Sequence, residues 1–475
     1  MPVEKTNSRA PDLPHRAAVI NVGLPAFGEA VRAQGAEAID VDWRIPGGED
    51  PELVACLQRL YGRGSERIDD ANTEVVRRLD QGAPVLVGVG EARREVPGME
   101  DHMILHCGPP LAWDEFCDPL RRSVRAAVVA EGWAASLEEA DALVGRGRAL
   151  LEPANHHATV LPMAGALGPT APVVVVDNPQ GGNRALSGIN QGPGKVAWFG
   201  VDAPEAIERL VWLREVMAPV LDACLRDNPV DLLALASQGL QMGDDVHMRS
   251  QASTNLLIRD LLPRLAALDD PRRQEVARFL AGNHLFFLNL SMAAAKALTD
   301  WAGAVKGSSV VVGMARNGTT FGVRLTGAQE RWFVARAPAV EDALYNADFG
   351  PDDAAPDIGD SAVLELVGLG GPAAAACPSV AAFVGGTIAG AVGVTEAMDT
   401  VCVGRSSRFK VPFLDFRGTP LAVDVRKVVE LGITPSINTG ILHSSSGHGQ
   451  IGAGVARAPV ECFQEAMRSL AHDGE

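Results

Sequence analysis

A chain of 475 residues is longer than most single domains, so we expect more than one hydrophobic core. Hydrophobic residues make up 47% of it and charged residues 21%, which is a globular composition and excludes a largely disordered protein. The net charge of -17 argues against nucleic acid as a partner, and an anionic substrate would need a local cluster of basic side chains or backbone N–H groups.

The cysteines and the N-terminal stretch indicate a cytoplasmic protein. Seven dispersed cysteines without a C-x-x-C pair are typical of a reduced compartment, and the first residues lack the apolar core of a signal peptide. The uncharged run 366–395 is as long as a membrane span, but alanine, glycine and proline dominate it. We therefore expect a buried layer of small residues there, and no membrane partner.

The first elements along the chain predict a Rossmann-like α/β domain over residues 1–95. We predict strands at 17–22, 36–41 and 83–90, a helix at 27–34 and helical structure across 51–80. The continuous apolar strand 83–90 is typical of a parallel sheet covered on both faces. The glycines after the first strand depart from the G-x-G-x-x-G fingerprint, which favours a plain βαβ unit over NAD binding.

The chain changes between strand-like and helix-like patterns, and these changes suggest three more domains. The predicted fold class is therefore a multidomain α/β (α+β) protein. The predicted domains are a second α/β domain at 96–202, a helical subdomain at 203–305 and a C-terminal α/β domain at 306–475. The second domain has a helical segment at 120–150 and a buried strand at 172–177, and the fourth opens with short strands between glycine turns.

Histidines occur in two suggestive pairings in the second predicted domain. Asn155 and His156 lie in a loop punctuated by glycine and proline, where they would bind a carbonyl group or act as a general acid or base. A purely structural role for such a histidine stays open. His102 and His106 have the spacing of a metal pair on a helix, but prolines follow at once, so we favour ordinary loop histidines and no metal.

The segment 243–249 (GDDVHMR) places Asp245, His247 and Arg249 at the start of a helical run. Two carboxylates, an imidazole and a guanidinium in seven residues would bind Mg²⁺ or orient a substrate. The alternative is a helix N-cap by Asp244 with solvated neighbours.

Arg316 and Asn317 follow a buried strand, at the strand end where α/β sheets usually bind ligands. The planar guanidinium suits a carboxylate or a phosphate. The segment 357–361 follows and contributes Asp360 as a further candidate for substrate binding.

Two glycine-containing segments complete the set of candidates. The N–H groups of Gly370 and Gly371 would form an anion cradle, or the glycines would serve only close packing. His443 opens a Ser/Gly-rich loop that also holds His448. We favour a functional His443 and a solvated His448 in a surface turn.

These segments together resemble the YlbE/YahG-like family, whose genes lie beside FdrA, over nearly the whole range from Ala17 to Phe463. The motifs that carry the resemblance are NVGLPAFGEAVRAQG followed by VDW, LHCGPPLAWDEFCDPLR, ANHHATVLPMAG, GDDVHMR, GNHLFFLNLSMAAAKA, GMARNGTTFGVR, PDIGDSA with GLGG, and FRGTPLAVDVRKVVELGITPSINTGILH.

One member of this family is a subunit of oxamate carbamoyltransferase. The resemblance therefore implies transfer of a carbamoyl group between carbamoyl phosphate and oxamate, in nitrogen catabolism from allantoin, with an FdrA-like partner subunit and a homo-oligomer. Carbamoyl phosphate would be the co-substrate. No cofactor is required by the motifs, and Mg²⁺ is the metal ion that would assist if one is used.

The residue types suggest a division of roles for this reaction. Arg316 and the glycine N–H groups would hold anions, Asn155 and His156 would polarise the carbonyl, and Asp245 or His247 would take the proton. Two other classes stay open: a non-catalytic scaffold or ligand-binding subunit of an FdrA-like complex, and a nucleotide- or CoA-dependent acyl ligase component.

Overall fold

The computed structural model describes residues 18–41, 45–384 and 386–473, and within them the chain is mixed α/β as predicted. The strands are β1 Ala18–Val22, β2 Glu37–Val41, β3 Val85–Glu91, β4 Met103–His106, β5 Leu150–Pro153, β6 Thr159–Val160, β7 Ala166–Leu167, β8 Pro172–Asn178, β9 Asn183–Gly188, β10 Val230–Asp231, β11 Val311–Asn317, β12 Thr320–Leu325, β13 Phe333–Arg336, β14 Val340–Tyr345, β15 Ile358–Gly359, β16 Cys402–Val411, β17 Arg417–Val423, β18 Ser436–Leu442 and β19 Gln450–Arg457.

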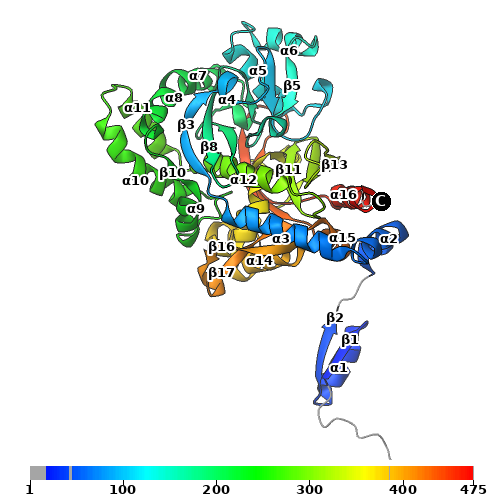
Figure 1. The fold of residues 1–475 in the computed structure, drawn as a ribbon. Helices are drawn as coiled ribbons and strands as arrows, with labels where there is room; N and C mark the ends of the chain where they lie inside the picture. Colours follow the sequence, from blue (N-terminus) through cyan, green and yellow to red (C-terminus); the bar gives the residue numbers. More distant parts are fainter. Residues whose placement is uncertain (1–17, 42–44, 385, 474–475) are drawn as a thin grey trace, which may run out of the picture.

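Helices connect and cover these strands (Figure 1). They are α1 Pro25–Ala33, α2 Pro51–Leu60, α3 Ser65–Gln81, α4 Ala92–Glu95, α5 Asp118–Ala130, α6 Leu137–Gly145, α7 Pro204–Trp212, α8 Ala218–Leu225, α9 Leu232–Gln241, α10 Gln251–Ala267, α11 Arg273–Gly282, α12 Phe287–Gly303, α13 Pro378–Phe383, α14 Ile388–Val401, α15 Val425–Leu431 and α16 Val460–Asp473. Short 3-10 helices include η3 Ala154–His157, η4 Ala197–Phe199, η7 Ser361–Val367 and η8 Gly371–Ala376.

The N-terminal βαβ unit forms as predicted, but it lies apart from the rest of the chain (Figure 1). β1 and β2 pair in parallel, and the open face of this two-stranded sheet exposes Ile20 (70%) and Ile39 (67%). The prediction that strand 83–90 extends a parallel sheet is wrong, because β3 pairs antiparallel with both β8 and β10. Residue 17 and the Asp42–Trp43 pair of the VDW motif lie outside the described residues.

Helix α12 runs through the middle of the main body (Figure 1). Its sequence is rich in Leu, Met and Ala on all sides, which is the pattern of a fully buried helix, and it packs on β8, β9, α3 and η7. The five-stranded sheet β10-β3-β8-β9-β6 lies against it. This helix therefore joins the central sheet to the segment that follows β15.

The predicted helical region 203–300 is confirmed by α7 to α12, and the predicted short strands after residue 306 by β11, β12 and β13. These strands form the antiparallel sheet β13-β12-β11-β15, beside a second sheet of order β14-β19-β18. One hydrophobic cluster combines buried side chains from Val75 to Leu442. The domain limits at 95, 202 and 305 do not coincide with breaks in this cluster, and they stay a prediction.

The small-residue run 366–395 contains η8, α13 and the start of α14. Its first part is buried as expected, from Leu366 through Cys377, whereas residues around Ile388 are exposed. Among the described residues, no helix combines the length and the apolar character needed to cross a bilayer.

Candidate active site

An inner cavity lies where the loop 243–250, η7 and β18 meet, with an empty volume of about 400 Å³ that includes open solvent. Its polar lining consists of His247, Ser361, Thr439 and Gln450. Apolar side chains close the remaining walls, namely Pro162, Met163, Trp198, Phe199, Met248, Leu285 and Leu288. The cavity thus has the form of a small-molecule site, with an apolar wall and a few convergent polar groups.

His247 enters this cavity from a strained turn. The preceding residue, Val246, has φ of 63°, a left-handed conformation that is costly for a β-branched side chain. The Asp245 carboxylate holds the turn by accepting the N–H groups of His247 (3.2 Å), Met248 (3.1 Å) and Arg249 (2.7 Å). The amide of Asn438 on β18 also donates to Asp245, at 2.5 Å.

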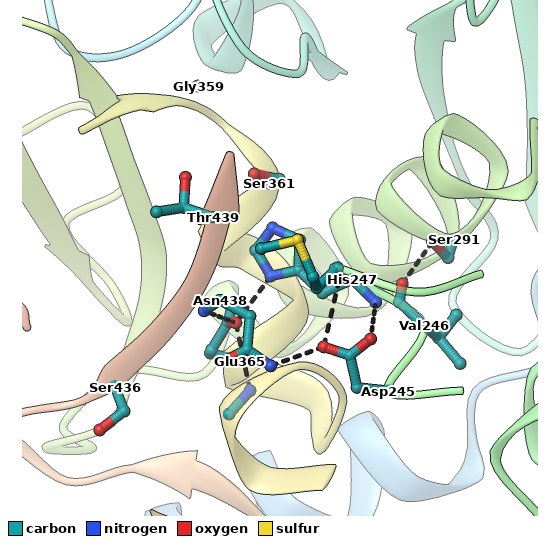
Figure 2. Close-up of polar contacts among 12 residues, drawn as sticks. Asp245, Val246, His247, Ser291, Gly359, Ser361, Glu365, Ser436, Asn438 and Thr439 are labelled. Carbon is teal, nitrogen blue, oxygen red and sulfur yellow. Dashed lines mark hydrogen bonds and ion pairs between the residues drawn. The ribbon is translucent and has the colours of Figure 1, made fainter. Parts of the chain in front are cut away.

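The imidazole of His247 is paired with the buried carboxylate of Glu365 on η7, as Figure 2 shows. The distance from Nδ1 to Oε1 is 2.7 Å. Because a carboxylate accepts, Nδ1 carries the proton and the lone pair of Nε2 is left for a ligand. No described residue bonds Nε2, and His247 lines the cavity.

Burial raises the pKa of Glu365, while the neighbouring His247 works in the opposite direction. The same Oε1 also accepts the N–H groups of Gly371 and Asn438, both at 3.3 Å. Gly370 leaves room for this carboxylate, since a Cβ built there would lie 2.1 Å from Oε1. The two glycines therefore serve the histidine–glutamate pair, which favours the close-packing alternative over the anion cradle.

Arg316 lies behind the cavity and is fully buried. It forms a two-pronged ion pair with Asp357 at 2.8 and 2.9 Å, and its other N–H groups donate to the Gly359 carbonyl, Ser361 and Thr439. All five N–H donors are used within the protein, so the predicted direct grip of Arg316 on an anion does not fit this geometry. Instead the guanidinium orients the hydroxyl groups of Ser361 and Thr439.

The hydroxyl of Ser361 accepts from Arg316 at 3.2 Å and keeps its own proton for the cavity. Thr439 uses its proton on Asp357, at 2.8 Å. Ser361 is therefore the hydroxyl donor that faces the same space as the free nitrogen of His247.

Asp360 precedes this serine but does not line the cavity. Its carboxylate accepts the N–H groups of Gly108 and Leu161, each at 2.8 Å, and ties three chain segments together. Burial raises the pKa of Asp360 to about 7, against the opposing effect of these hydrogen bonds. The predicted contact of Asp360 with substrate is thus replaced by a positioning role.

The remaining candidates of the segment 243–249 also serve the loop. Asp244 accepts the N–H groups of Ala252 (3.1 Å) and Ser253 (2.8 Å) in the first turn of the following helix, α10, whose N-cap residue is Ser250. The capping role is thus found in part, but the neighbours Asp245 and His247 are buried rather than solvated. Arg249 donates to Asp244 at 3.2 Å. Among the described residues, no group of three His, Cys, Asp or Glu side chains is arranged to hold a metal ion, so nothing here supports Mg²⁺ at this segment.

Asn155 and His156 lie in a different cluster, on η3. Asn155 accepts from the buried Arg324 at 3.2 Å, and Nε2 of His156 accepts from the indole of Trp332 at 2.8 Å. Burial lowers the pKa of His156. Neither side chain lines the inner cavity, so the structure does not bring this pair to the site predicted for it.

Asn317 and His443 also lie outside the inner cavity. The Asn317 side chain closes a turn by accepting the N–H of Thr320 at 2.7 Å and donating to the Pro109 carbonyl. The ring of His443 lies 5.2 Å from that of His448, which lines a separate cavity together with Lys195 and His284. The structure therefore does not bring Asn317 and His443 into the inner cavity, and their contacts with substrate stay a prediction.

Sequence reasoning missed Glu365 and Ser361 as functional residues. Both stand in the segment that leads from the PDIGDSA motif to GLGG, and a glutamate followed within six positions by three glycines was the available signal. It also missed Asn438 and Thr439, which stand directly before the glycine of the SINTGILH segment.

A second cavity of about 630 Å³ lies on the other side of Trp198. Its charged lining residues are satisfied within the protein: Glu131 accepts the N–H of Thr170, and Arg214 donates to the hydroxyl of Thr170 and to the Ala130 carbonyl. No histidine lines it. We therefore place the candidate chemistry at His247.

Comparison with known proteins agrees with this architecture and shows the family of the chain. A family profile described as "Oxamate carbamoyltransferase subunit AllG" matches residues 150–361. The chain is similar to the oxamate carbamoyltransferase subunit AllG of Escherichia coli K12, at 40% identity over 85% of this chain and 98% of the relative. It is also similar to the uncharacterised protein YahG of the same organism, at 36% identity over 94% of this chain and 96% of the relative.

A crystal structure of a conserved protein of unknown function from Enterococcus faecalis V583 has the same fold. The TM-score is 0.84 at 36% identity, covering 86% of this chain and 98% of that one. The mixed α/β fold is thus that of a class of proteins already seen in bacteria. The chain belongs to the AllG/YahG family, as the resemblance noted in the sequence suggested.

Proposed function

We propose that this chain is a carbamoyltransferase subunit that moves a carbamoyl group between carbamoyl phosphate and oxamate or a related small amide. The observation that carries the proposal is the pairing of His247 with Glu365, which leaves a basic nitrogen beside the hydroxyl of Ser361 in an enclosed cavity. The name of the AllG relative supports the choice of oxamate and carbamoyl phosphate.

The geometry suits the two requirements of this transfer. The amide nitrogen of oxamate attacks the carbonyl carbon of carbamoyl phosphate, and His247 Nε2 takes the proton that the nitrogen loses. The bond between that carbon and the phosphate oxygen breaks, so the products are oxalurate and phosphate. The Ser361 hydroxyl, oriented by Arg316, donates to the carbonyl oxygen while negative charge develops on it.

Glu365 and Asp245 act through His247 in this scheme. Glu365 fixes the imidazole tautomer and stabilises the imidazolium that forms when the proton is taken, as a carboxylate does in hydrolase triads. Asp245 holds the turn that carries the histidine. This replaces the earlier hypothesis that Asp245 itself takes the proton, because its oxygens are occupied by the turn and by Asn438.

The relative is named as a subunit, so we further propose that this chain works with a second subunit of the FdrA-like type and forms a homo-oligomer. The complex, rather than the isolated chain, is accordingly the material for assays.

The test is phosphorolysis of oxalurate by the complex, followed as the formation of carbamoyl phosphate and oxamate. We expect His247→Gln to lower kcat by about 10²- to 10⁴-fold, the usual contribution of a general base. His156→Gln is the matched control, because glutamine keeps an acceptor for Trp332 outside the cavity, and it should retain activity within about threefold.

Equal activity of the His247→Gln complex and the wild-type complex would contradict the catalytic role. That outcome would favour the rival view of the chain as a scaffold, in which the partner performs the chemistry. Failure of the wild-type complex to consume oxalurate in the presence of phosphate would contradict the proposed reaction itself.

A further inference from the structure

An outer cavity adjoins the inner one, and the two, together called the cleft, share Phe199, Met248, Leu285 and Gln450 in their linings. The outer cavity encloses about 1080 Å³, including open solvent. A ligand at His247 therefore lies next to the outer cavity, and a substrate with two parts would extend from one space toward the other.

Basic side chains gather in the outer cavity. Lys195, His284 and His448 line it and are exposed, and no aspartate or glutamate is among its lining residues. This composition is unusual for a chain with a net charge of -17, whose overall field repels anions. The local cluster is of the kind that an anionic ligand of an acidic protein requires.

The segment 192–195 adds backbone donors to this cluster. Gly192 and Gly194 have φ of 80° and 94°, so the chain turns sharply before Lys195. The N–H of Gly192 is held by Asn190 at 3.0 Å, whereas in the described part of the chain the N–H groups of Gly194 and Lys195 have no acceptor. Free backbone N–H groups in a glycine turn beside a lysine are a recurrent means of binding phosphate.

The histidine side of the cluster is held by aromatic packing. The His448 ring lies 5.6 Å from that of Phe349 and 5.2 Å from that of His443. This gives the otherwise polar loop 444–449 a fixed contact, while His448 itself is exposed, as the sequence suggested.

Resting on the proposed function, we propose that Lys195, His284, His448 and the N–H groups of Gly194 and Lys195 bind the phosphate group of the substrate. The phosphate lies in the outer cavity and the carbonyl carbon reaches into the inner one, beside His247 and Ser361. The leaving phosphate then departs from the side of the cleft that opens to solvent. Arg316 has no free N–H for this task, which leaves the outer cluster as the source of positive charge at the cleft.

The experiment measures the binding of inorganic phosphate to the full chain by titration calorimetry and by the ³¹P resonance, at low ionic strength. We expect Lys195→Ala and the double variant His284→Asn/His448→Asn to weaken phosphate binding by tenfold or more. Lys195→Arg should restore most of the affinity. Lys306→Ala removes an exposed lysine that lines neither cavity, and it should bind phosphate as the wild type does.

A titration with oxamate tests which of the two anionic substrates, phosphate or oxamate, the cluster binds. Oxamate binding should change by less than about threefold in Lys195→Ala, since the proposal assigns the cluster to phosphate. A loss of oxamate affinity with phosphate affinity retained would overturn that assignment. Phosphate binding that is equal in Lys195→Ala, Lys306→Ala and the wild type, or absent from the wild type, would overturn the site.

Kinetics of the complex distinguish this inference from the proposed function. If the complex phosphorolyses oxalurate, Lys195→Ala should raise KM for phosphate at least tenfold with a smaller change in kcat, and an unchanged KM would overturn the phosphate site alone. If phosphate binds through Lys195 and no ureido acid is consumed, the reaction fails while the phosphate site stands.

Discussion

The side chains that face the cleft depend on neighbours that never touch a ligand. His247 is held by Glu365 and Asp245, and Ser361 by Arg316. Glycine at position 370 is part of this support, because its φ of 64° and its lack of a Cβ both bring the backbone close to the Glu365 carboxylate. At the residue scale the site is therefore sensitive to substitutions that add a single methyl group.

We predict that Gly370→Ala lowers kcat for oxalurate phosphorolysis by about tenfold or more, because the new Cβ would collide with Glu365 and displace it from His247. Gly432→Ala is the matched control, since Gly432 has φ of 66° and nothing within 4 Å of an added Cβ. Its ψ is 17°, against -125° at Gly370, so it controls for an alanine at positive φ, at about 1 kcal/mol, without the collision. Equal kinetics of the two variants would contradict the role of Gly370.

A second prediction at this scale concerns Asp360, whose pKa burial raises from 3.8 to about 7. Between these two pH values the folded protein holds a proton that the unfolded chain has lost, so this group lowers stability as pH rises from about 4 to 7. Asp360→Asn removes this titration. Urea unfolding at pH 5 and pH 7 should show a smaller loss of stability for the variant than for the wild type, and an identical loss in both proteins would contradict it.

At the scale of elements, one buried ion pair joins three strands. Arg316 lies on β11, Asp357 immediately precedes β15, and the Thr439 hydroxyl on β18 is hydrogen-bonded to both of them. Both side chains of the pair are completely buried, so water cannot solvate the charge that remains if one of them is removed.

We predict that Asp357→Asn lowers the free energy of unfolding by about 3–5 kcal/mol, because it leaves the Arg316 charge buried and unpaired. Asp342→Asn breaks the exposed pair with Arg457, whose closest atoms lie 3.5 Å apart, and should cost less than about 1 kcal/mol. Urea unfolding of both variants measures the contrast. Similar losses in the free energy of unfolding would show that the buried pair contributes no more to stability than the exposed one.

For the whole molecule, the N-terminal unit and the main body contribute differently. No residue of 18–41 belongs to a hydrophobic cluster of the described chain, and the ion pair between Arg32 and Asp40 lies within this unit. The cleft is built entirely from residues beyond 160. The unit thus adds nothing visible to the core that supports the site.

We predict that a chain beginning at Ile45 keeps the main thermal transition within about 2 °C of the full chain, since no buried contact of the main body is lost. Differential scanning calorimetry checks this. A matched chain beginning at Ser65 also loses α2, with its buried Leu53 and Leu57, and should melt several degrees lower. Equal melting of the two truncated chains would contradict the prediction.

The sequence by itself determined the mixed α/β class, most of the helices and strands, and the family. Local patterns are sufficient for these, since apolar periodicity and glycine turns act over neighbouring residues, as in strand β8 and helices α7 to α12. The same patterns marked His247 as a candidate and left Asp244 open as a cap.

Only the tertiary structure decided which polar residues act together. Glu365 lies 118 positions from His247, and Thr439 lies 123 from Arg316, distances along the chain over which no periodicity operates. The antiparallel pairing of β3 was likewise fixed by partners remote in sequence. Whether a buried arginine is free or already satisfied depends on how distant segments pack around it, and that packing is a property of the folded chain.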